Sequence, residues 1–225
     1  LMTLSTIISI VVGVGLGVYT AQRQYQLPDR VWSGIASVFM VIPTVVLAIL
    51  VVFFAIEINM ATGYRIFYVT GLSSYDGENV PLALVDFLQH IFLPTVVLTI
   101  ISAVGYHLTQ RTYLLDEMHA DYVRTARAKG LTRKQAIRRH ALRASLIPTA
   151  VSVAFSIAGI FTGAVMTEKI FAIHGLGEYF VNCINGNNVH GAVAVAAFSG
   201  ACTLVGALLA DLFAAAIDPR IKMMG

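Results

Sequence analysis

The stretch Asp121–Arg143, DYVRTARAKGLTRKQAIRRHALR, is the most polar part of an otherwise apolar chain. It holds 8 of the 15 Lys and Arg residues, although charged residues make up only 12% of the sequence and hydrophobic ones 57%. A soluble domain has about 25% charged residues. The composition therefore predicts a membrane protein in which this stretch lies outside the bilayer.

Five apolar stretches surround it, each close to the length of about 20 residues that a spanning helix needs. A single span must satisfy its own backbone hydrogen bonds in lipid, which favours helices. The runs also lack the alternation of barrel strands. We therefore expect one all-α transmembrane domain over residues 1–225. The expected spans cover residues 1–19, 33–56, 91–108, 145–166 and 192–216.

The charges outside these spans are distributed unevenly. The segments 22–32 and 109–144 and the C-terminal tail hold 13 of the 15 Lys and Arg residues. The segments 57–90 and 167–191 hold Arg65 and Lys169 but half of the 12 acidic residues. Because basic loops stay inside, we expect the loop 109–144 and the C-terminus to be cytoplasmic, and the acidic loops to be external.

This topology places residue 1 outside, so we expect a further span before it. The alternative is a five-span protein with an external N-terminus.

Prolines and glycines punctuate the spans. Pro43 lies in the middle of the second span, and Pro94 and Pro148 lie near the starts of the third and fourth. Proline kinks a helix, which suits a helix lining a transport path and equally a purely structural bundle. The GxGxG string at residues 13–17 lies inside an apolar span, which favours close helix packing over nucleotide binding.

The polar stretch has the signals of two short helices. Met118, Tyr122 and Ala126 recur at a helical spacing and predict one weakly apolar face. Gly130 stands where a helix C-terminus is expected, and Thr132-Arg-Lys-Gln135 matches a capping box. The second helix would run back towards the fourth span.

A helix pair tied at both ends to spans could serve as a rigid handle for a cytoplasmic partner. The alternative is a basic loop that only fixes topology and touches anionic lipid headgroups. The residues by themselves leave these two hypotheses open.

The string RTARAKGLTRKQAIRRHALR resembles the EAA loop of importer-type ABC transporter permeases, in the form of the oligopeptide/dipeptide branch. The Glu-Ala-Ala positions fall on residues 124–126, the glycine on Gly130, and the Ile-x-Leu-Pro ending on residues 140–143. The general pattern is kept at Ala126, Gly130 and Leu142.

Four further segments are similar to the same branch. They are MVIPTVVLAILVVFF (40–54), QHIFLPTVVLT (89–99), IFAIHGLGEYFVNCI (170–184) and DPRIK (218–222). The external loop with Gly175, Leu176 and Gly177 points to the B-type subunit. The chain departs from the branch at His174, where proline is usual, and at NGNNVHG (185–191).

The resemblance implies a type I ABC importer permease fold in the cytoplasmic membrane of a prokaryote. It implies a subunit that translocates oligopeptides or dipeptides by alternating access, with nickel chelates or glutathione-like compounds as alternative cargo. The implied partners are a homologous C-type permease subunit, two cytoplasmic ATPase subunits that carry ATP and Mg, and an external peptide-binding protein.

It also implies a set of residues that couple this chain to the ATPase subunits. We expect Ala126 and Gly130 to permit close approach, and Arg124, Arg127 and Lys129 to make polar contacts. The full set is Arg124, Thr125, Ala126, Arg127, Lys129, Gly130, Leu131, His140 and Leu142.

No motif for catalysis or a cofactor is present in the sequence. It lacks the GxxxxGK[ST] phosphate loop, HExxH and CxxC, so we expect no catalytic residue, metal or bound cofactor, and no nucleic-acid partner.

An ATP-independent channel or secondary transporter is the other hypothesis, but it predicts a charge in mid-membrane. The aromatic residues of loop 57–90 favour a membrane-edge belt over a docking surface for a binding protein. They are Tyr64, Phe67, Tyr68 and Tyr75.

Overall fold

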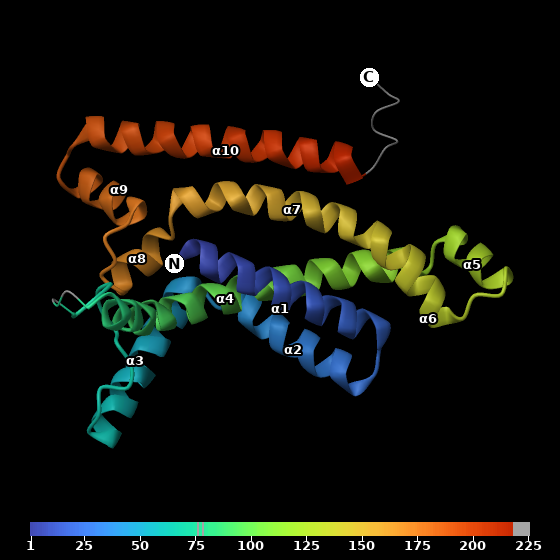
Figure 1. Ribbon diagram of the computed structural model, residues 1–225, viewed down its shortest axis with the longest axis horizontal. Helices are drawn as coiled ribbons and strands as arrows, with labels where there is room; N and C mark the ends of the chain where they lie inside the picture. Colours follow the sequence, from blue (N-terminus) through green and yellow to red (C-terminus); the bar gives the residue numbers. More distant parts are fainter. Residues whose placement is uncertain (76, 78, 218–225) are drawn as a thin grey trace. The chain divides into compact units, whose positions relative to one another are not determined.

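The computed structural model describes residues 1–75, 77 and 79–217, and within them every regular element is a helix (Figure 1). Five helical stretches are long and apolar enough to cross a membrane, which confirms the expected all-α transmembrane fold. The elements are α1 (Met2–Gln22), α2 (Leu27–Val41), α3 (Thr44–Thr62), α4 (Val80–Met118), α5 (Asp121–Ala128), α6 (Arg133–Ala136), the π-helix η1 (Ile137–Ala141), α7 (Leu142–Thr162), α8 (Val165–Ile170), α9 (Leu176–Asn185) and α10 (Val189–Ile217).

The chain divides into two compact units. The first comprises residues 1–6, 42–101 and 159–202, and the second comprises residues 7–41, 102–158 and the segment from residue 203. The helices α1, α4, α7 and α10 each contribute to both units. Asp76, Glu78 and the tail segment DPRIK lie outside the described residues.

The span expected over residues 33–56 is not one kinked helix, which corrects the role given to Pro43. The helix α2 ends at Val41 and α3 begins at Thr44, with Pro43 in an extended conformation (φ −58°, ψ 138°) as the residue before α3. A proline disfavours helical geometry in the residue before it and fits well at a helix start. Pro43 therefore separates two helices, whereas Pro94 and Pro148 do lie inside α4 and α7.

Other helices extend beyond the expected spans. The helix α4 begins at Val80 and ends at Met118, so it takes in residues that were assigned to both flanking loops, 57–90 and 109–144. The segment 167–191 contains α9 and most of α8. The connections are therefore shorter and more ordered than apolarity alone indicated, because polar residues can continue a helix past the end of its apolar run.

In the second unit, α1 packs closely along α4 through two glycines. A methyl group at Gly13 would lie 2.5 Å from the carbonyl oxygen of Ala103, and one at Gly17 would lie 2.8 Å from that of His107. Gly15, on the other side of the helix, has no such neighbour within 4 Å. The GxGxG string is thus a packing feature, as expected.

In the first unit, the loop after α3 is held by side chains. The Asn59 side-chain oxygen accepts hydrogen bonds from the backbone N–H groups of Ile66 and Phe67, both at 2.9 Å. The Phe67 ring stacks on Phe92, with ring centroids 6.3 Å apart. Tyr64, in contrast, is 76% exposed. Of the two loop residues Tyr64 and Phe67, Tyr64 therefore has the more accessible ring.

Candidate coupling site

The polar stretch forms a helical hairpin, which we define as residues 121–141. Its first helix, α5, ends in a Schellman motif: the Gly130 N–H donates to the Arg127 carbonyl at 3.0 Å, and the Leu131 N–H donates to the Ala126 carbonyl at 3.3 Å. Gly130 has φ +96°, a left-handed conformation that glycine adopts without strain. The predicted helix end and the break after it are confirmed.

The second helix of the hairpin begins with the predicted capping box. The Gln135 N–H donates to the Thr132 hydroxyl at 3.3 Å, and the Thr132 N–H donates to the Gln135 side-chain oxygen at 3.0 Å. From α6 the chain continues through η1 into α7 without a break. The hairpin is therefore joined directly to the membrane-spanning helix that contains Pro148.

An apolar cluster in the second unit fixes the hairpin to the bundle. It contains buried residues of α1, α4, α5, α6 and η1, and Leu131, Met118 and Leu142 pack against its edge. Burial of this kind stabilises by about 25 cal/mol per Å² of apolar surface. The cluster joins the hairpin to the ends of α1 and α4, so the two should move together. The buried members are Ala21, Leu114, Val123, Ala126, Ala136, Ile137 and Ala141.

The inward face of α5 differs from the predicted one. Val123 and Ala126 are buried, whereas Tyr122 is 43% exposed and Met118 belongs to α4. The predicted spacing assumed one continuous helix from Met118. The chain instead turns between α4 and α5, so the helical phase restarts at Asp121.

This arrangement also changes the expected roles of two residues. Ala126 is only 8% exposed, so the close approach that it permits is to this chain's own helices. At Gly130 a methyl group would meet nothing within 4 Å, so the backbone conformation, not a lack of space, requires glycine. Leu131 and His140, within the hairpin, and Leu142, the first residue of α7, are half-buried.

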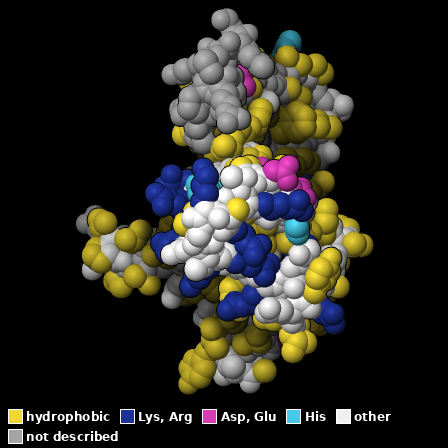
Figure 2. Space-filling view, turned by 90° about the vertical axis from the view of Figure 1, so that its right-hand side faces the viewer, with side chains coloured by type: hydrophobic (Ala, Val, Ile, Leu, Met, Phe, Trp, Pro, Cys, Tyr) yellow, Lys and Arg dark blue, Asp and Glu magenta, His cyan; other side chains and the backbone are white. Residues whose placement is uncertain are grey.

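The outward face of the hairpin is polar and basic, and Figure 2 shows Lys and Arg side chains gathered there. Arg124 lies 3.6 Å from Asp121, but both side chains are largely exposed, so this ion pair contributes little. Of the expected coupling residues, those exposed on α5 and at its end are Arg124, Thr125, Arg127, Lys129 and Gly130. This face is free to meet a partner.

The sequence reasoning missed a buried ion pair close to the hairpin. Asp29 in the first turn of α2 accepts hydrogen bonds from Arg111 Nε at 2.6 Å and Nη2 at 2.9 Å, and its side chain is 3% exposed. The Tyr25 N–H donates to the same carboxylate at 2.8 Å. The hydrogen bonds from Arg111 hold the pKa of Asp29 below its ordinary value of 3.8. This pair joins the first turn of α2 to the C-terminal part of α4.

Two further groups of buried polar side chains join α1, α4 and α7 by hydrogen bonds. The Thr20 hydroxyl and His107 Nε2 are 3.0 Å apart, and Gln110 Nε2 donates to the Ser145 hydroxyl at 3.0 Å. The Thr149 hydroxyl donates to the Gln110 side-chain oxygen. Interhelical hydrogen bonds of this kind join spanning helices, here α1, α4 and α7.

Thr149 also borders a groove most of whose lining residues carry hydroxyl groups. It has a volume of about 260 Å³ and lies between α4 and α7, where the Tyr106 and Ser156 hydroxyls are hydrogen-bonded to each other. The Ser152 hydroxyl donates to the carbonyl of Pro148 at 3.1 Å, one turn earlier in the helix. The lining residues are Ser102, Gly105, Tyr106, Thr109, Thr149, Ser152 and Ser156. An apolar span thus carries one polar face.

In the first unit, Leu176 and Gly177, which were expected in a loop, belong to the first turn of α9, and Gly175 is the residue before it. This helix start encloses a buried carboxylate. Glu168 is 5% exposed, and its two oxygens accept hydrogen bonds from the Ala164 N–H at 3.1 Å and the Glu178 N–H at 3.0 Å. It thereby satisfies an N–H group near the start of each of α8 and α9. The glycines leave room for the carboxylate, which explains why the loop needs them.

A Gly177→Ala substitution is expected to destabilise the first unit by about 1–3 kcal/mol. The added methyl group would lie 2.6 Å from the Val165 Cα and 2.9 Å from Glu168 Oε2. Thermal unfolding of the purified protein in detergent measures the effect. Gly200→Ala in α10 is the matched control, because its methyl group meets nothing within 4 Å. Equal unfolding temperatures for the two variants would contradict this account of the loop.

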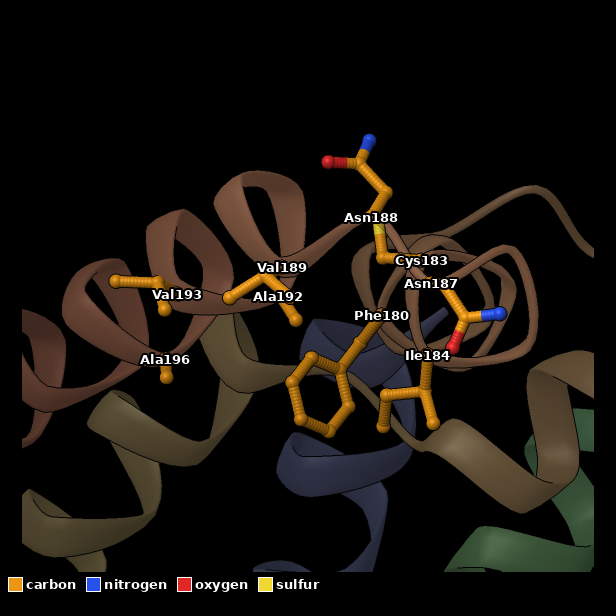
Figure 3. Close-up of a pocket in the computed structure, with 9 residues that line it drawn as sticks. All are labelled: Phe180, Cys183, Ile184, Asn187, Asn188, Val189, Ala192, Val193 and Ala196. Carbon is orange, nitrogen blue, oxygen red and sulfur yellow. The ribbon is translucent and has the colours of Figure 1, made fainter.

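The departing string NGNNVHG (185–191) covers the last residue of α9, the turn at residues 186–188 and the first three residues of α10. Asn187 has a positive φ of 53°, and the Asn188 side-chain oxygen accepts from the Gly191 N–H at 3.0 Å, which caps α10. A pocket of about 410 Å³ lies beside this turn. Figure 3 shows Phe180 of α9 and Ala192 of α10 bordering it. The pocket is mostly apolar, and its shape follows from the turn.

Together the fold and the hairpin define a class of protein: a multi-pass helical membrane protein with a structured polar hairpin between two of its spans. Among the described residues, no group of three or more His, Cys, Asp or Glu side chains could hold a metal ion. The comparison with known families makes the class specific. Residues 13–223 match the family described as binding-protein-dependent transport system inner membrane component, and the chain belongs to this family.

Individual relatives agree with the family. The chain is 41% identical over 224 residues to the oligopeptide transport system permease protein OppB of Mycobacterium tuberculosis (strain ATCC 25618 / H37Rv), which covers 99% of this chain and 69% of the relative. It is 29% identical over 222 residues to AppB of Bacillus subtilis (strain 168), an oligopeptide permease protein, covering 99% and 68%. It is 26% identical over 221 residues to the dipeptide permease protein DppB of Lactococcus lactis subsp. cremoris (strain MG1363), covering 98% and 67%. The resemblance to oligopeptide/dipeptide permeases is confirmed.

Proposed function

We propose that this chain is the membrane-spanning subunit of an ATP-driven importer of oligopeptides or dipeptides. The observation that carries the proposal is the hairpin, residues 121–141, which is capped at both helix boundaries and packed on the ends of α1 and α4. The named relatives are peptide permease proteins, which favours peptides as cargo.

In this proposal the hairpin is the coupling element and faces the cytoplasm. A short helix in a groove is a recurring recognition mode, and the exposed basic face of α5 would lie in a groove of an ATPase subunit. The apolar cluster behind it would transmit movement of the ATPase subunit to the spans. Such a transition requires that the partner binds one conformation better than the other.

The groove between α4 and α7 is our candidate for part of the translocation path. Its hydroxyl groups lie within stretches long and apolar enough to cross a membrane. Polar groups inside a membrane typically face a bundle interior or a water-filled cavity. A hydroxyl oxygen that donates its proton within the chain can still accept from the N–H group of any peptide backbone, so such a lining would suit cargo of varied sequence.

The remaining parts of the proposal concern partners and location. We propose a homologous C-type permease subunit, two cytoplasmic subunits that bind ATP and Mg, and an external peptide-binding protein. The chain itself would hold no cofactor and catalyse no reaction. Its C-terminus would lie in the cytoplasm, as the positive-inside rule indicates.

The test is ATP-dependent peptide uptake by the complete complex in proteoliposomes. We expect labelled peptide to accumulate with Mg-ATP and to stay at background when ATP is withheld or replaced by a non-hydrolysable analogue. Copurification of two ATPase subunits and a second permease subunit is the accompanying measurement. Uptake that proceeds equally without ATP would overturn the proposal and favour a channel or a secondary transporter.

A further inference from the structure

Three arginines converge on one surface pocket where the hairpin meets the fourth spanning stretch. Arg138 and Arg139 lie in η1 and Arg143 lies in the first turn of α7, and with Leu131 and Gln135 they line a pocket of about 300 Å³. Within the part of the chain that the structure describes, none of the three guanidinium groups forms an ion pair. The pocket therefore offers positive charge without an internal counter-ion.

The π-helix explains why these arginines share one side. In a regular α-helix, residues five positions apart point about 140° apart around the axis. In η1 the Leu142 N–H donates to the Ile137 carbonyl, five residues earlier, so residues five apart lie approximately above one another. This geometry places Arg138 and Arg143 on one side of the helix, where both line the pocket. Single π-turns inside α-helices are frequent at functional sites.

The surroundings of the pocket are charged on one side and apolar on the other. Leu146 lies one helical turn beyond Arg143 on the same face of α7 and is 36% exposed. The pocket lies on a helical stretch long and apolar enough to span a membrane, which covers Arg133–Ile170. A ligand that matches both features has an anionic group at one end and hydrocarbon at the other.

We propose that Arg138, Arg139 and Arg143 bind the phosphate headgroup of an anionic phospholipid whose acyl chains lie along Leu146. Guanidinium groups pair with phosphate oxygens through two parallel hydrogen bonds. Basic pockets at the cytoplasmic ends of spanning helices bind lipid headgroups in this way. A bound lipid would anchor the base of the hairpin at the membrane surface. This site differs from the exposed face of α5 that we assign to the ATPase subunit.

The test compares two double variants that remove the same charge. The first is Arg139→Gln/Arg143→Gln in the pocket, and the second is Arg133→Gln/Lys134→Gln, on exposed α6 positions outside it. The complete complex is reconstituted in phosphatidylcholine nanodiscs with or without phosphatidylglycerol. Native mass spectrometry then counts the phosphatidylglycerol molecules that each protein retains.

We expect one retained phosphatidylglycerol to be lost from the pocket variant and kept by the unaltered protein and by the α6 variant. Each cation near an anionic surface contributes about fivefold to lipid binding, so two removed arginines should weaken binding by about twenty-fivefold. An Arg139→Lys/Arg143→Lys variant, which keeps the charge but lacks the planar fork, should fall between them. Equal loss in both Gln variants, or no loss in either, would overturn the site.

Two further measurements separate a lipid from other anions. Inorganic phosphate is added to the complex in zwitterionic detergent, and the unfolding temperature is compared with that after addition of phosphatidylglycerol. If inorganic phosphate raises the unfolding temperature and phosphatidylglycerol does not, the pocket binds free phosphate and the lipid proposal is wrong. If the pocket variant instead keeps its lipid but no longer binds the ATPase subunits, the arginines contact a protein partner and the proposal is wrong.

Discussion

A Gly130→Pro substitution will abolish peptide-stimulated ATP hydrolysis by the reconstituted complex. Gly130 has φ +96°, whereas proline is fixed near −65°, and proline also lacks the N–H that donates to the Arg127 carbonyl. The cost of about 3 kcal/mol or more would deplete the native hairpin conformation by roughly a hundredfold. The measurement is the ATPase rate with and without peptide and its binding protein.

The matched control is Gly130→Asn, since asparagine tolerates the left-handed conformation at about 1 kcal/mol. A β-carbon here meets nothing within 4 Å, so the cost of the substitution lies in the backbone conformation. The Asn variant should retain most of the stimulation. If Gly130→Pro hydrolyses ATP in response to peptide as well as the unaltered chain does, the hairpin does not couple the ATPase subunits to the membrane spans.

An Asp29→Ala substitution will destabilise the second unit by about 3 kcal/mol, since a broken buried pair leaves a charge without its partner. The Asp29 side chain is 3% exposed and that of Arg111 is 22% exposed, so Arg111 would regain only part of its hydration. For a chain of this size the unfolding temperature should fall by about 6–12 °C. Thermal unfolding in detergent measures it.

Two controls and a pH series test the cause. Asp29→Ala/Arg111→Met should recover most of the lost stability, because it removes both charges. Asp121→Ala, which breaks only an exposed pair with Arg124, should cost less than about 1 kcal/mol. Because Arg111 lowers the pKa of Asp29, the pair's stabilisation is present above pH 3.8 and is lost as pH falls through the lower folded-state pKa. If Asp29→Ala unfolds at the same temperature as the unaltered chain, the pair does not have this role.

The candidate coupling site was predictable in its location and in its local turns. Gly130 and the box from Thr132 to Gln135 are signals between residues close in sequence, and the structure has both. Which residues face inward was not predictable. The turn between α4 and α5 resets the helical phase, so Ala126 packs with Val123 in place of Tyr122.

The sequence by itself determined the helical class of this protein, because apolar length, caps and charge bias are properties of neighbouring residues. The tertiary structure decided the rest. Asp29 meets Arg111 across 82 positions, and Glu168 fills the space that Gly177 leaves. Arg138 and Arg143 line one pocket with Leu131, which the turn before α6 brings there. Such groupings depend on how segments far apart or separated by a turn pack together, and no pattern of neighbouring residues encodes that.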